Sequence, residues 1–564
     1  MKGGADSTRR ALLGAVAALP LAACTRAQRP HFDGAWLGAA HELGHRLRDL
    51  STASDRASPP ARSAPRGADV SRRAGVIVVG AGIAGLAATR ALMRAGIDDV
   101  HVFELEDAAG GNSRGHVMGG MACPLGAHYL PLPSPEALEV AEWLDELGVR
   151  RLVGGQPVFD ERQLCHAPQE RLFIAGQWVD GLLPPLDALP SAERGETQRQ
   201  YFQFHAAVVA AAKGQVFCVP TARSRASAAT AALDRLSFAD WLGAEALNAP
   251  ALRWYLDYCC RDDFGAGAAF ISAWAGLHYF ASRHGFHAPG ADSEERGAVL
   301  TWPEGNAWLA KRLATGLGDR LHLGQVALRV RESRHDVQVD LLNSASQSLD
   351  TWTARHVVLA VPLFVAARLC EVAPSALDPA ATSLHHAPWL VANLHLAEPL
   401  ADRGGAPPAW DNVMMDSPTL GYVDAMHQST RAHPGATVLT AYWALGGQSP
   451  HELRSQRMRL RNEPWSFWAD AVVRELAGPH PDIATRIVRI DLMRYGHAMA
   501  IPSPGIRTHA ALAALVESRG RVRFAHSDLS GYSVFEEAFF HGDRAGRSIA
   551  RESARRPRKR AVLR

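Results

Sequence analysis

The sequence predicts an α/β protein built on a Rossmann-type dinucleotide-binding domain, three-layered with a mainly parallel sheet. The chain has 564 residues, of which 47% are apolar and 21% charged, as expected of a large globular protein with an ample core. Strand and helix signals alternate from Val76 onward, and a glycine-rich turn joins the first strand signal to the first helix signal. These two observations predict the fold class.

Composition and charge exclude several classes of protein. The net charge is only +3, so no general affinity for nucleic acid is expected. No apolar run reaches the roughly 18 residues that a membrane-spanning helix needs. The mixture of residue types excludes collagen, a coiled coil and wholesale disorder.

The N-terminus resembles an export signal. Arg9-Arg10 precede a short apolar stretch that ends at Leu21-Ala22-Ala23-Cys24. A basic segment followed by about 13 apolar residues is typical of a cleaved signal peptide. The paired arginines resemble a twin-arginine signal, and the last four residues resemble a bacterial lipobox. We expect an exported, periplasmic protein whose only membrane contact is a lipid anchor at Cys24. The alternative is an ordinary secretory signal with a chance cysteine.

The segments before and after the predicted α/β fold are expected to be a helix, a linker and a tail. Residues 25–50 have apolar residues at roughly helical spacing and predict an amphipathic helix, and residues 51–73 read as a linker. The basic segment 551–564 is predicted to be a disordered tail. His41-Glu42-Leu43-Gly44-His45 matches the H-E-x-x-H zinc pattern, but Gly44 weakens a helix and no third ligand follows at the usual spacing. We therefore predict no metal site.

A dinucleotide site is predicted at the first strand and helix. A buried strand over 76–79 leads into the turn from Gly80 to Gly85, and the next strand ends at Glu104. Gly80 makes the tight turn, Gly82 lets the backbone approach a pyrophosphate, and Gly85 lets helix and strand pack closely. Ile83 and Ala84 belong to the same turn. Glu104 lies about twenty residues beyond, where an acid accepts hydrogen bonds from ribose hydroxyls.

The residues after Glu104 resemble the flavin amine oxidase superfamily. That family has an acid, five residues and then Gly-Gly-Arg, and this chain keeps the spacing with Gly110-Gly111-Asn112-Ser113-Arg114. The family also includes polyamine oxidases, amino-acid oxidases, phytoene desaturases and protoporphyrinogen oxidases. Asn112 replaces the usual arginine, and we expect Arg114 to take over its phosphate contact. The resemblance implies that the cofactor is FAD.

Further segments resemble the family in the same order, from Leu125-Gly126-Ala127-His128 through Trp302-Pro303 to the last helix. They imply flavin contacts from 126–128, an adenine clamp, a strand end, an acid for a ribityl hydroxyl and a helix N-terminus that faces the flavin pyrimidine. No cysteine lies in the C-terminal flavin segment, so we expect FAD to be non-covalent. These additional cofactor-binding residues are Gly126, Ala127, His128, Val326, Ala360, Asp528 and Phe535.

The resemblance also implies that the FAD domain is interleaved with an α+β substrate domain. After a signal at 1–24 and an N-terminal helix and linker at 25–74, we expect FAD-binding parts and substrate parts to alternate. The predicted parts are 75–150 (FAD), 151–300 (substrate), 301–370 (FAD), 371–494 (substrate), 495–550 (FAD) and the tail 551–564.

Candidate catalytic residues lie in three segments. Ser530-Gly531-Tyr532 resembles the family segment that supplies one wall of an aromatic cage over the flavin. Tyr495 and His497 precede the last FAD segment and line the same cavity in this interpretation; packing roles are the alternative. At the position where many amine oxidases keep a lysine that assists oxygen reduction, this chain has Arg368, which cannot act as a base.

These residues predict an FAD-dependent oxidoreductase of amine-oxidase type, with hydride transfer from an amine or another C–H donor to flavin N5. Arg368 favours a dehydrogenase over an oxidase. One alternative is a desaturase-like dehydrogenase of carotenoids or other polyenes. The other is a flavin-loaded accessory protein that turns over no small molecule. The sequence leaves the substrate and the electron acceptor open.

Overall fold

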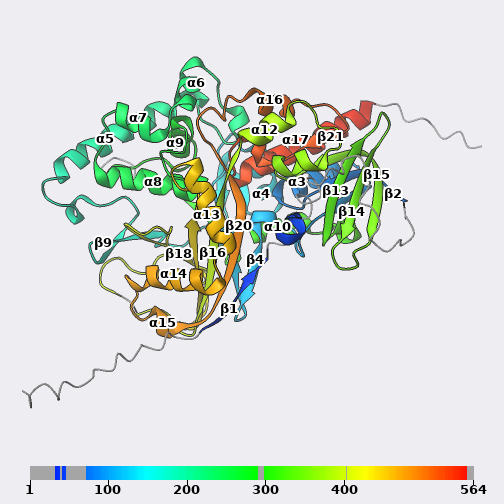
Figure 1. Ribbon diagram of the computed structural model, residues 1–564. Helices are drawn as coiled ribbons and strands as arrows, with labels where there is room; N and C mark the ends of the chain where they lie inside the picture. Colours follow the sequence, from blue (N-terminus) through cyan, green and yellow to red (C-terminus); the bar gives the residue numbers. More distant parts are fainter. Residues whose placement is uncertain (1–31, 39–40, 46–70, 290–296, 402, 556–564) are drawn as a thin grey trace, which may run out of the picture.

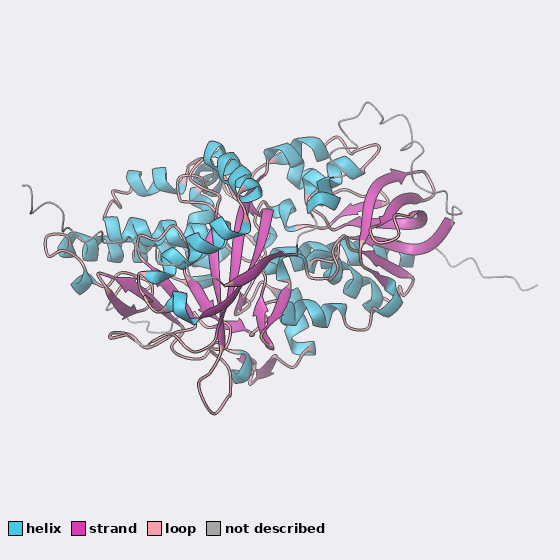
Figure 2. Cartoon of the chain, turned by 60° about the horizontal axis from the view of Figure 1, so that its bottom comes forward, coloured by secondary structure: helices cyan, strands magenta, loops and turns pink. Residues whose placement is uncertain are grey.

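The computed structural model describes residues 32–38, 41–45, 71–289, 297–401 and 403–555. The predicted signal with Cys24, most of the linker and residues 556–564 of the predicted tail lie outside this part of the chain. Two halves are visible, one around a sheet at the right of Figure 1 and one around a larger sheet at its centre and left. In both, strands are flanked by helices (Figure 2).

A seven-stranded sheet forms the core of the dinucleotide-binding half. Its central strands are parallel, as the sequence predicts: β2 pairs with β3 and with β15, β15 also with β21, and β3 with β12. The strands β14 and β13 extend the sheet in antiparallel fashion. The bounds are β2 Ser71–Val79, β3 Val100–Phe103, β12 Leu321–His322, β13 Gln325–Glu332, β14 Val337–Asn343, β15 Leu349–Leu359 and β21 Val522–Phe524.

Helices cover both faces of this sheet, which gives the predicted three layers. One face carries α3 Ile83–Arg94, α4 Leu138–Glu146, α10 Ala307–Ala314 and α17 Phe535–Arg555. The other face carries α11 Leu363–Leu369, α12 Leu377–Ser383 and α16 Ala510–Val516. Glycines let α17 approach α3 closely: a Cβ at Gly542 would overlap the carbonyl oxygen of Ala84, and one at Gly546 would lie 2.5 Å from that of Ala88.

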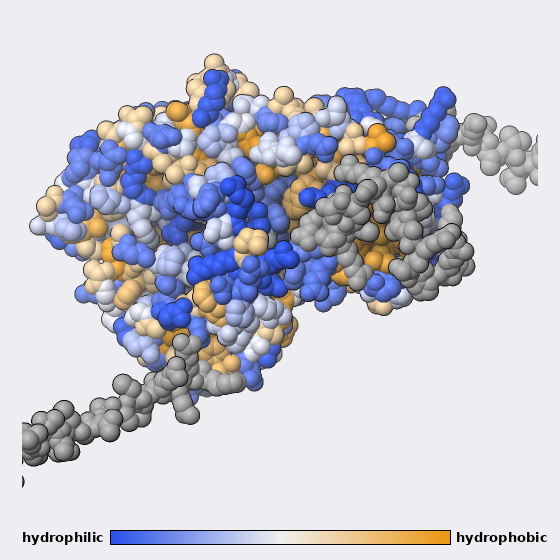
Figure 3. Space-filling view, in the orientation of Figure 1, coloured by the Kyte–Doolittle hydropathy of each residue, from blue (hydrophilic) through white to orange (hydrophobic). Residues whose placement is uncertain are grey.

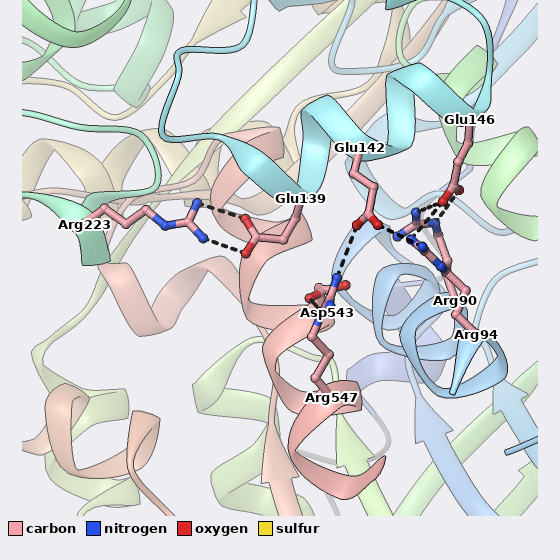
Figure 4. A network of polar contacts seen from close by, with 8 residues as sticks. All are labelled: Arg90, Arg94, Glu139, Glu142, Glu146, Arg223, Asp543 and Arg547. Atoms are coloured by element: carbon pink, nitrogen blue, oxygen red, sulfur yellow. Dashed lines mark hydrogen bonds and ion pairs between the residues drawn. The ribbon is translucent and has the colours of Figure 1, made fainter. Parts of the chain in front are cut away.

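Ion pairs link α4 to both α3 and α17 (Figure 4). Arg94 contacts Glu142 and Glu146 at 2.8 Å, and Arg547 of α17 contacts Glu142 at 3.2 Å. These pairs are partly exposed, so each contributes little on its own, but together they fix how the helices sit beside one another.

An eight-stranded sheet forms the core of the substrate half, in the order β1-β20-β16-β19-β18-β17-β9-β10. Alternate residues of β16 face opposite sides: Trp389 and Val391 point to the core under α5–α9, whereas Leu390 and Ala392 point to the core under α14. The strands are β1 Asp33–Leu37, β9 Glu170–Ile174, β10 Gln177–Asp180, β16 His385–Leu396, β17 Asp411–Met414, β18 Tyr422–Asp424, β19 Thr437–Ala444 and β20 Ile487–Ile501. The helices are α5 Arg194–Ala211, α6 Ala228–Arg235, α7 Phe238–Ala244, α8 Pro250–Phe264, α9 Ala273–Tyr279, α13 Pro450–Asn462, α14 Trp465–Ala477 and α15 Ile483–Arg486.

Three short strand pairs complete the fold: β4 Gly115–Met118 with β5 Met121–Pro124, β7 Arg150–Val153 with β8 Gln156–Phe159, and β6 Tyr129–Pro131 with β11 Val299–Thr301. On the face shown in Figure 3, hydrophobic residues occur in small clusters among hydrophilic ones. None of the helices in the described ranges is long and apolar enough to cross a membrane. The six cysteines in those ranges are all free thiols, and four of them are buried.

The predicted N-terminal helix is wrong for residues 33–37. These residues form β1, which pairs in parallel with β20, and only His41–His45 are helical in the described part of this segment. The physical reason is tertiary: β20 offers an unpaired edge, and Trp36 lies under the Arg494 guanidinium, 4.6 Å from the ring centroid. The described residues contain no group of three or more metal-ligating side chains at His41–His45 or elsewhere.

Two predicted boundaries also shift. The boundary between 494 and 495 falls inside β20, which belongs wholly to the substrate sheet. The predicted tail begins inside α17, which continues to Arg555. In both places a secondary structure element runs through the predicted boundary.

Candidate active site

A cavity of about 720 Å³ lies between the two halves. Its floor is made by the carboxyl ends of β2, β3 and β15, and its far wall by β16, β19 and β20. Ligands of parallel α/β sheets bind at the carboxyl ends of the strands, so the cavity occupies the position that the fold class favours. Of the predicted cofactor-binding residues, all line it except Gly85 and Asp528.

The glycine turn opens a backbone cradle at this floor. Gly80 has φ +98°, and Gly82 caps α3 without a side-chain hydrogen bond or an acid in the first turn. Gly111 faces Gly82 so closely that a Cβ on it would lie 3.2 Å from the Gly82 Cα. Gly85 lies behind the cradle, where a Cβ would overlap the Gly80 carbonyl oxygen. Free helix N–H groups beside bare backbone suit a pyrophosphate.

Glu104 lies at the cavity wall and is held by two backbone donors. The N–H groups of Ala81 and Glu106 donate to its carboxyl at 2.7 and 3.0 Å. Burial raises the pKa of Glu104. The two backbone hydrogen bonds fix the Glu104 carboxyl at the position where a ribose would be bound.

Asn112 and Arg114 occupy different positions at the cradle. The Asn112 amide donates to the Ala498 carbonyl at 2.5 Å, so its side chain ties the loop to β20. Arg114 pairs with Asp107 at 2.6 Å and with Glu106 at 3.4 Å, and its buried Nε has no hydrogen-bond partner. An orphaned guanidinium donor beside the bare cradle fits an anionic group. The residues present therefore fit the dinucleotide part of FAD.

The segment 126–128 lies where the two halves meet. The Tyr442 hydroxyl donates to the Gly126 carbonyl at 3.1 Å, and the His128 ring stacks on Tyr442 with centroids 4.4 Å apart. Burial lowers the pKa of His128 to about 3, so this imidazole is neutral. Val326, Ala360 and Phe535 add apolar wall.

Asp528 does not line the cavity, contrary to the prediction. Its carboxyl is fully buried and accepts the Leu363 N–H at 2.8 Å, and it also contacts His386 Nε2 at 3.0 Å and His526 Nδ1 at 3.1 Å. Burial opposes ionisation, but the two imidazoles hold the pKa of Asp528 well below its usual range. The carboxyl of Asp528 is thus surrounded by protein groups, and His526 and Ser527 line the cavity in its place.

Tyr532 also lies behind the wall rather than on it. Its hydroxyl donates to the Asp263 carboxyl at 3.0 Å, and its ring packs against Phe264 and His278 with centroids 5.4 and 5.2 Å away. The aromatic wall of the cavity comes from other residues, of which His128, Tyr495, His497 and Phe535 belong to the predicted set. The aromatic lining residues of the substrate half are Tyr129, Trp389, Tyr442 and Tyr495.

Tyr495, His497 and Arg368 all line the cavity. The Tyr495 hydroxyl donates to the Leu125 carbonyl at 2.9 Å. The His497 ring lies 4.8 Å from that of Phe364, and burial together with nearby basic groups, Arg457 and His386 foremost, lowers its pKa to about 3. Arg368 donates to the Phe364 carbonyl at 2.7 Å. Among the described residues that line the cavity there is neither a lysine nor a cysteine.

An acidic group that sequence reasoning missed lies at the substrate end. Asp262 and Asp263, from the last turn of α8, line the cavity together with Arg283. A π-helix over Phe280–His284 brings Arg283 inward, where it contacts Asp263 at 2.8 Å and Glu536 at 3.6 Å. One signal was available in the sequence: adjacent acids end a helix whose other residues are largely apolar.

Asp262 differs from its neighbour because no described residue forms an ion pair or hydrogen bond with it. Burial first, and then the charge of Asp263, raise the pKa of Asp262 to about 7. Asp411 lies near it, and its pKa is also raised by burial and by the surrounding carboxyls. The substrate end therefore holds more carboxyls than cations.

Comparisons with known proteins agree with this geometry. The model of the family described as flavin containing amine oxidoreductase matches residues 83–550. The sequence has no significant match among curated proteins. Among solved structures, cyclohexylamine oxidase from Brevibacterium oxydans IH-35A has a TM-score of 0.62 at 19% identity, over 86% of this chain and 100% of that one.

Two other structures are similar in fold. Putrescine oxidase bound to putrescine has a TM-score of 0.60 at 17% identity, over 85% of this chain and 99% of that one. A fatty acid isomerase from P. acnes that produces CLA has a TM-score of 0.56 at 14% identity, over 83% of this chain and 97% of that one. At such identities the likeness concerns the fold. The family match covers most of the sequence, and with the cradle it shows an FAD-dependent oxidoreductase of amine-oxidase type. The chain belongs to the family of flavin-containing amine oxidoreductases.

Proposed function

We propose that this enzyme oxidises an amine, taking a hydride from a carbon bonded to nitrogen, and that Asp262 accepts a cationic group of the substrate. The observation that carries the proposal is the unpaired carboxyl of Asp262 at the cavity wall. The fold neighbours include enzymes whose names specify amine substrates, which supports the same class.

The charges at the substrate end favour a cation. The guanidinium of Arg283 forms ion pairs with two carboxyls, those of Asp263 and Glu536. In the described part of the chain it forms no ion pair with Asp262. A carboxylate that is partly shielded from water and has no ion-pair partner is costly, so the pKa of Asp262 is raised to about 7 and the group binds a proton below that pH. A substrate ammonium group would replace that proton and form a charge-assisted hydrogen bond.

The aromatic wall would orient such a substrate. Tyr442 and Tyr495 are fixed because their hydroxyls donate to backbone carbonyls, and Trp389 is opposite Tyr495 in the strand register. Rigid aromatic faces attract a cation, exclude water and restrict how a donor carbon can lie.

Bound FAD supplies the two-electron acceptor for this chemistry. The residues that would hold it are Gly82, Gly111, Glu104 and Arg114, which fit the dinucleotide. We infer non-covalent attachment, because no cysteine is among the described lining residues. We also infer a dehydrogenase rather than an oxidase, because Arg368 lines the cavity and cannot share a proton with a bound water as an amine can.

An anaerobic titration tests the proposed substrate class. Holoenzyme is mixed with monoamines, diamines or polyenes, and bleaching of the visible flavin absorbance is recorded. We expect amines to bleach the flavin, with Asp262→Asn raising the required concentration about 10- to 100-fold, since a charged hydrogen bond is lost. The control is Asp187→Asn, which removes an exposed carboxyl of the same half.

Two other outcomes of the titration would favour the alternative functions. Bleaching by polyenes and not by amines favours the desaturase-like alternative. Bleaching by dithionite alone, with no effect of any organic donor, favours the accessory-protein alternative.

We further propose that the enzyme is exported and anchored at Cys24, which rests on the N-terminal sequence alone. Fractionation of cells that express Cys24→Ser tests it. We expect the variant to be exported but soluble, whereas a variant that stays with the membranes would exclude the lipid anchor.

A further inference from the structure

The N-terminal segment reaches the cavity although it lies outside the family match at 83–550. Its described parts, residues 32–38 and 41–45, are called the strap below. The strand β1 runs parallel to β20 with Leu37 opposite Met493, and β20 continues from there into the cavity wall at Tyr495 (Figure 1). At the end of the strap, Gly44 and His45 line the cavity themselves.

The strap is seated tightly along β20. At Gly34, a Cβ would overlap both the Ile490 carbonyl oxygen and the Trp465 ring, so only glycine fits this strand. Phe32 packs on Trp465 with ring centroids 6.1 Å apart, and Trp36 lies under the Arg494 guanidinium. Strand pairing and two aromatic contacts therefore hold the strap in one register.

The end of the strap at Gly38 lies close to two residues of the cavity wall. Gly38 has φ +65°, and a Cβ there would lie 2.5 Å from Met493 Sδ and 3.4 Å from Arg114 Nη1. Both of these residues line the cavity, and Arg114 carries the orphaned Nε beside the cradle. His45 then lies close enough to His497 to influence its pKa, together with Arg368. Of the described parts of the strap, Gly38 therefore lies beside Arg114 at the cofactor cradle, and His45 lies near His497 at the cavity wall.

We propose that the strap closes the cavity over bound FAD and slows its release, so that cofactor retention depends on an N-terminal element outside the catalytic fold. The strap is joined to the substrate half through β1 and adds Gly44 and His45 to the cavity wall. Such a closure suits an enzyme that leaves the compartment of cofactor synthesis, as the N-terminal sequence predicts. It would act on the dissociation rate, since the cradle itself is unchanged.

Flavin fluorescence tests this directly, because release of FAD from diluted holoenzyme can be followed with time. Gly34→Val would unseat β1 without touching the cavity, and we expect FAD release about tenfold faster than in the wild type. Gly195→Ala is the control: this exposed glycine lies outside the cavity, a Cβ there meets nothing within 4 Å, and we expect release within about twofold of the wild type. If Gly34→Val releases FAD at the wild-type rate while substrate affinity changes, the proposal is wrong.

A second variant covers the case in which Gly34→Val fails to fold. Asp33 and Arg489 are register partners at the outer end of β1, so Asp33→Cys with Arg489→Cys can be joined by oxidation. We expect the oxidised variant to release FAD more slowly than the same variant after reduction. Equal rates in the two states, with the disulfide verified by mass spectrometry, would overturn the proposal.

Discussion

The two halves of this enzyme build their parts of the cavity in different ways. The dinucleotide half presents backbone: bare glycines at 80, 82 and 111 and a helix N-terminus without a capping side chain. The substrate half presents side chains from α8, the π-helix, β16, β19 and β20, which are far apart in the sequence. The backbone site depends on glycines, which have no Cβ atom to fill the space. The side-chain site depends on buried charged groups, which need partners of opposite charge.

Breaking the backbone site has the largest expected effect. In Gly85→Ala the new Cβ would overlap the Gly80 carbonyl oxygen and lie 3.2 Å from the Ala360 Cβ, so strand and helix cannot both keep their places. We expect colourless protein that retains no FAD, measured by absorbance after purification. Gly195→Ala is the control, since a Cβ at this exposed position meets nothing within 4 Å. Yellow Gly85→Ala protein with normal FAD content would contradict this account.

Breaking the side-chain site should lower the free energy of unfolding, and by more for a buried ion pair than for an exposed one. Arg283→Leu leaves Asp263 and Glu536 buried without their shared cation. We expect a loss of about 3–5 kcal/mol in the free energy of unfolding, measured by urea denaturation. The control Arg162→Leu breaks an exposed ion pair with Asp160, and we expect a much smaller loss because solvent screens exposed charges. Similar losses in both variants would show that the buried cluster has no special role.

The same difference explains what the sequence could predict. Glycines at fixed spacing between a strand and a helix form a local pattern, and Gly82, Gly111 and Glu104 all lie at the cavity as expected. Asp262 and Trp389 line the same cavity only because distant strands and helices pack together, and no local spacing in the sequence records that. Their chemistry could not be assigned before the fold was known.

The positions that the structure places differently from the prediction are also determined by long-range contacts. Asp528 and Tyr532 match short motifs, but their side chains are taken up by partners from elsewhere in the chain, His386 and Asp263. The strand β1 has helix-like spacing and pairs with β20 because that edge is available. In each case a long-range contact overrides a local pattern.

A pH series sharpens the comparison from the side of Asp262. Its folded-state pKa of about 7 is above the ordinary value for aspartate, so the folded protein binds this proton more tightly than the unfolded chain. Stability from this group is therefore full below about pH 4 and is lost as the pH rises toward 7. Asp262→Asn cannot ionise, and we expect it to be more stable than the wild type at pH 8 in thermal unfolding, with a smaller difference at pH 5. A difference that is independent of pH would show that the carboxyl is not held protonated by the cavity.

The smallest expected effect concerns Arg368, where the two halves share one wall. Its guanidinium donates to the Phe364 carbonyl of its own helix and stays charged, so it cannot exchange a proton with a nearby water. We expect dithionite-reduced enzyme to reoxidise slowly in air and quickly with a quinone. In Arg368→Lys, an amine at the same wall can share protons, and stopped-flow reoxidation should be a few-fold faster with oxygen but unchanged with the quinone. Arg355→Lys, an exposed change on β15 outside the cavity, is the control for a general effect of the substitution. If the wild type already reacts with oxygen as fast as with the quinone, Arg368 does not limit that reaction, and the dehydrogenase assignment fails with it.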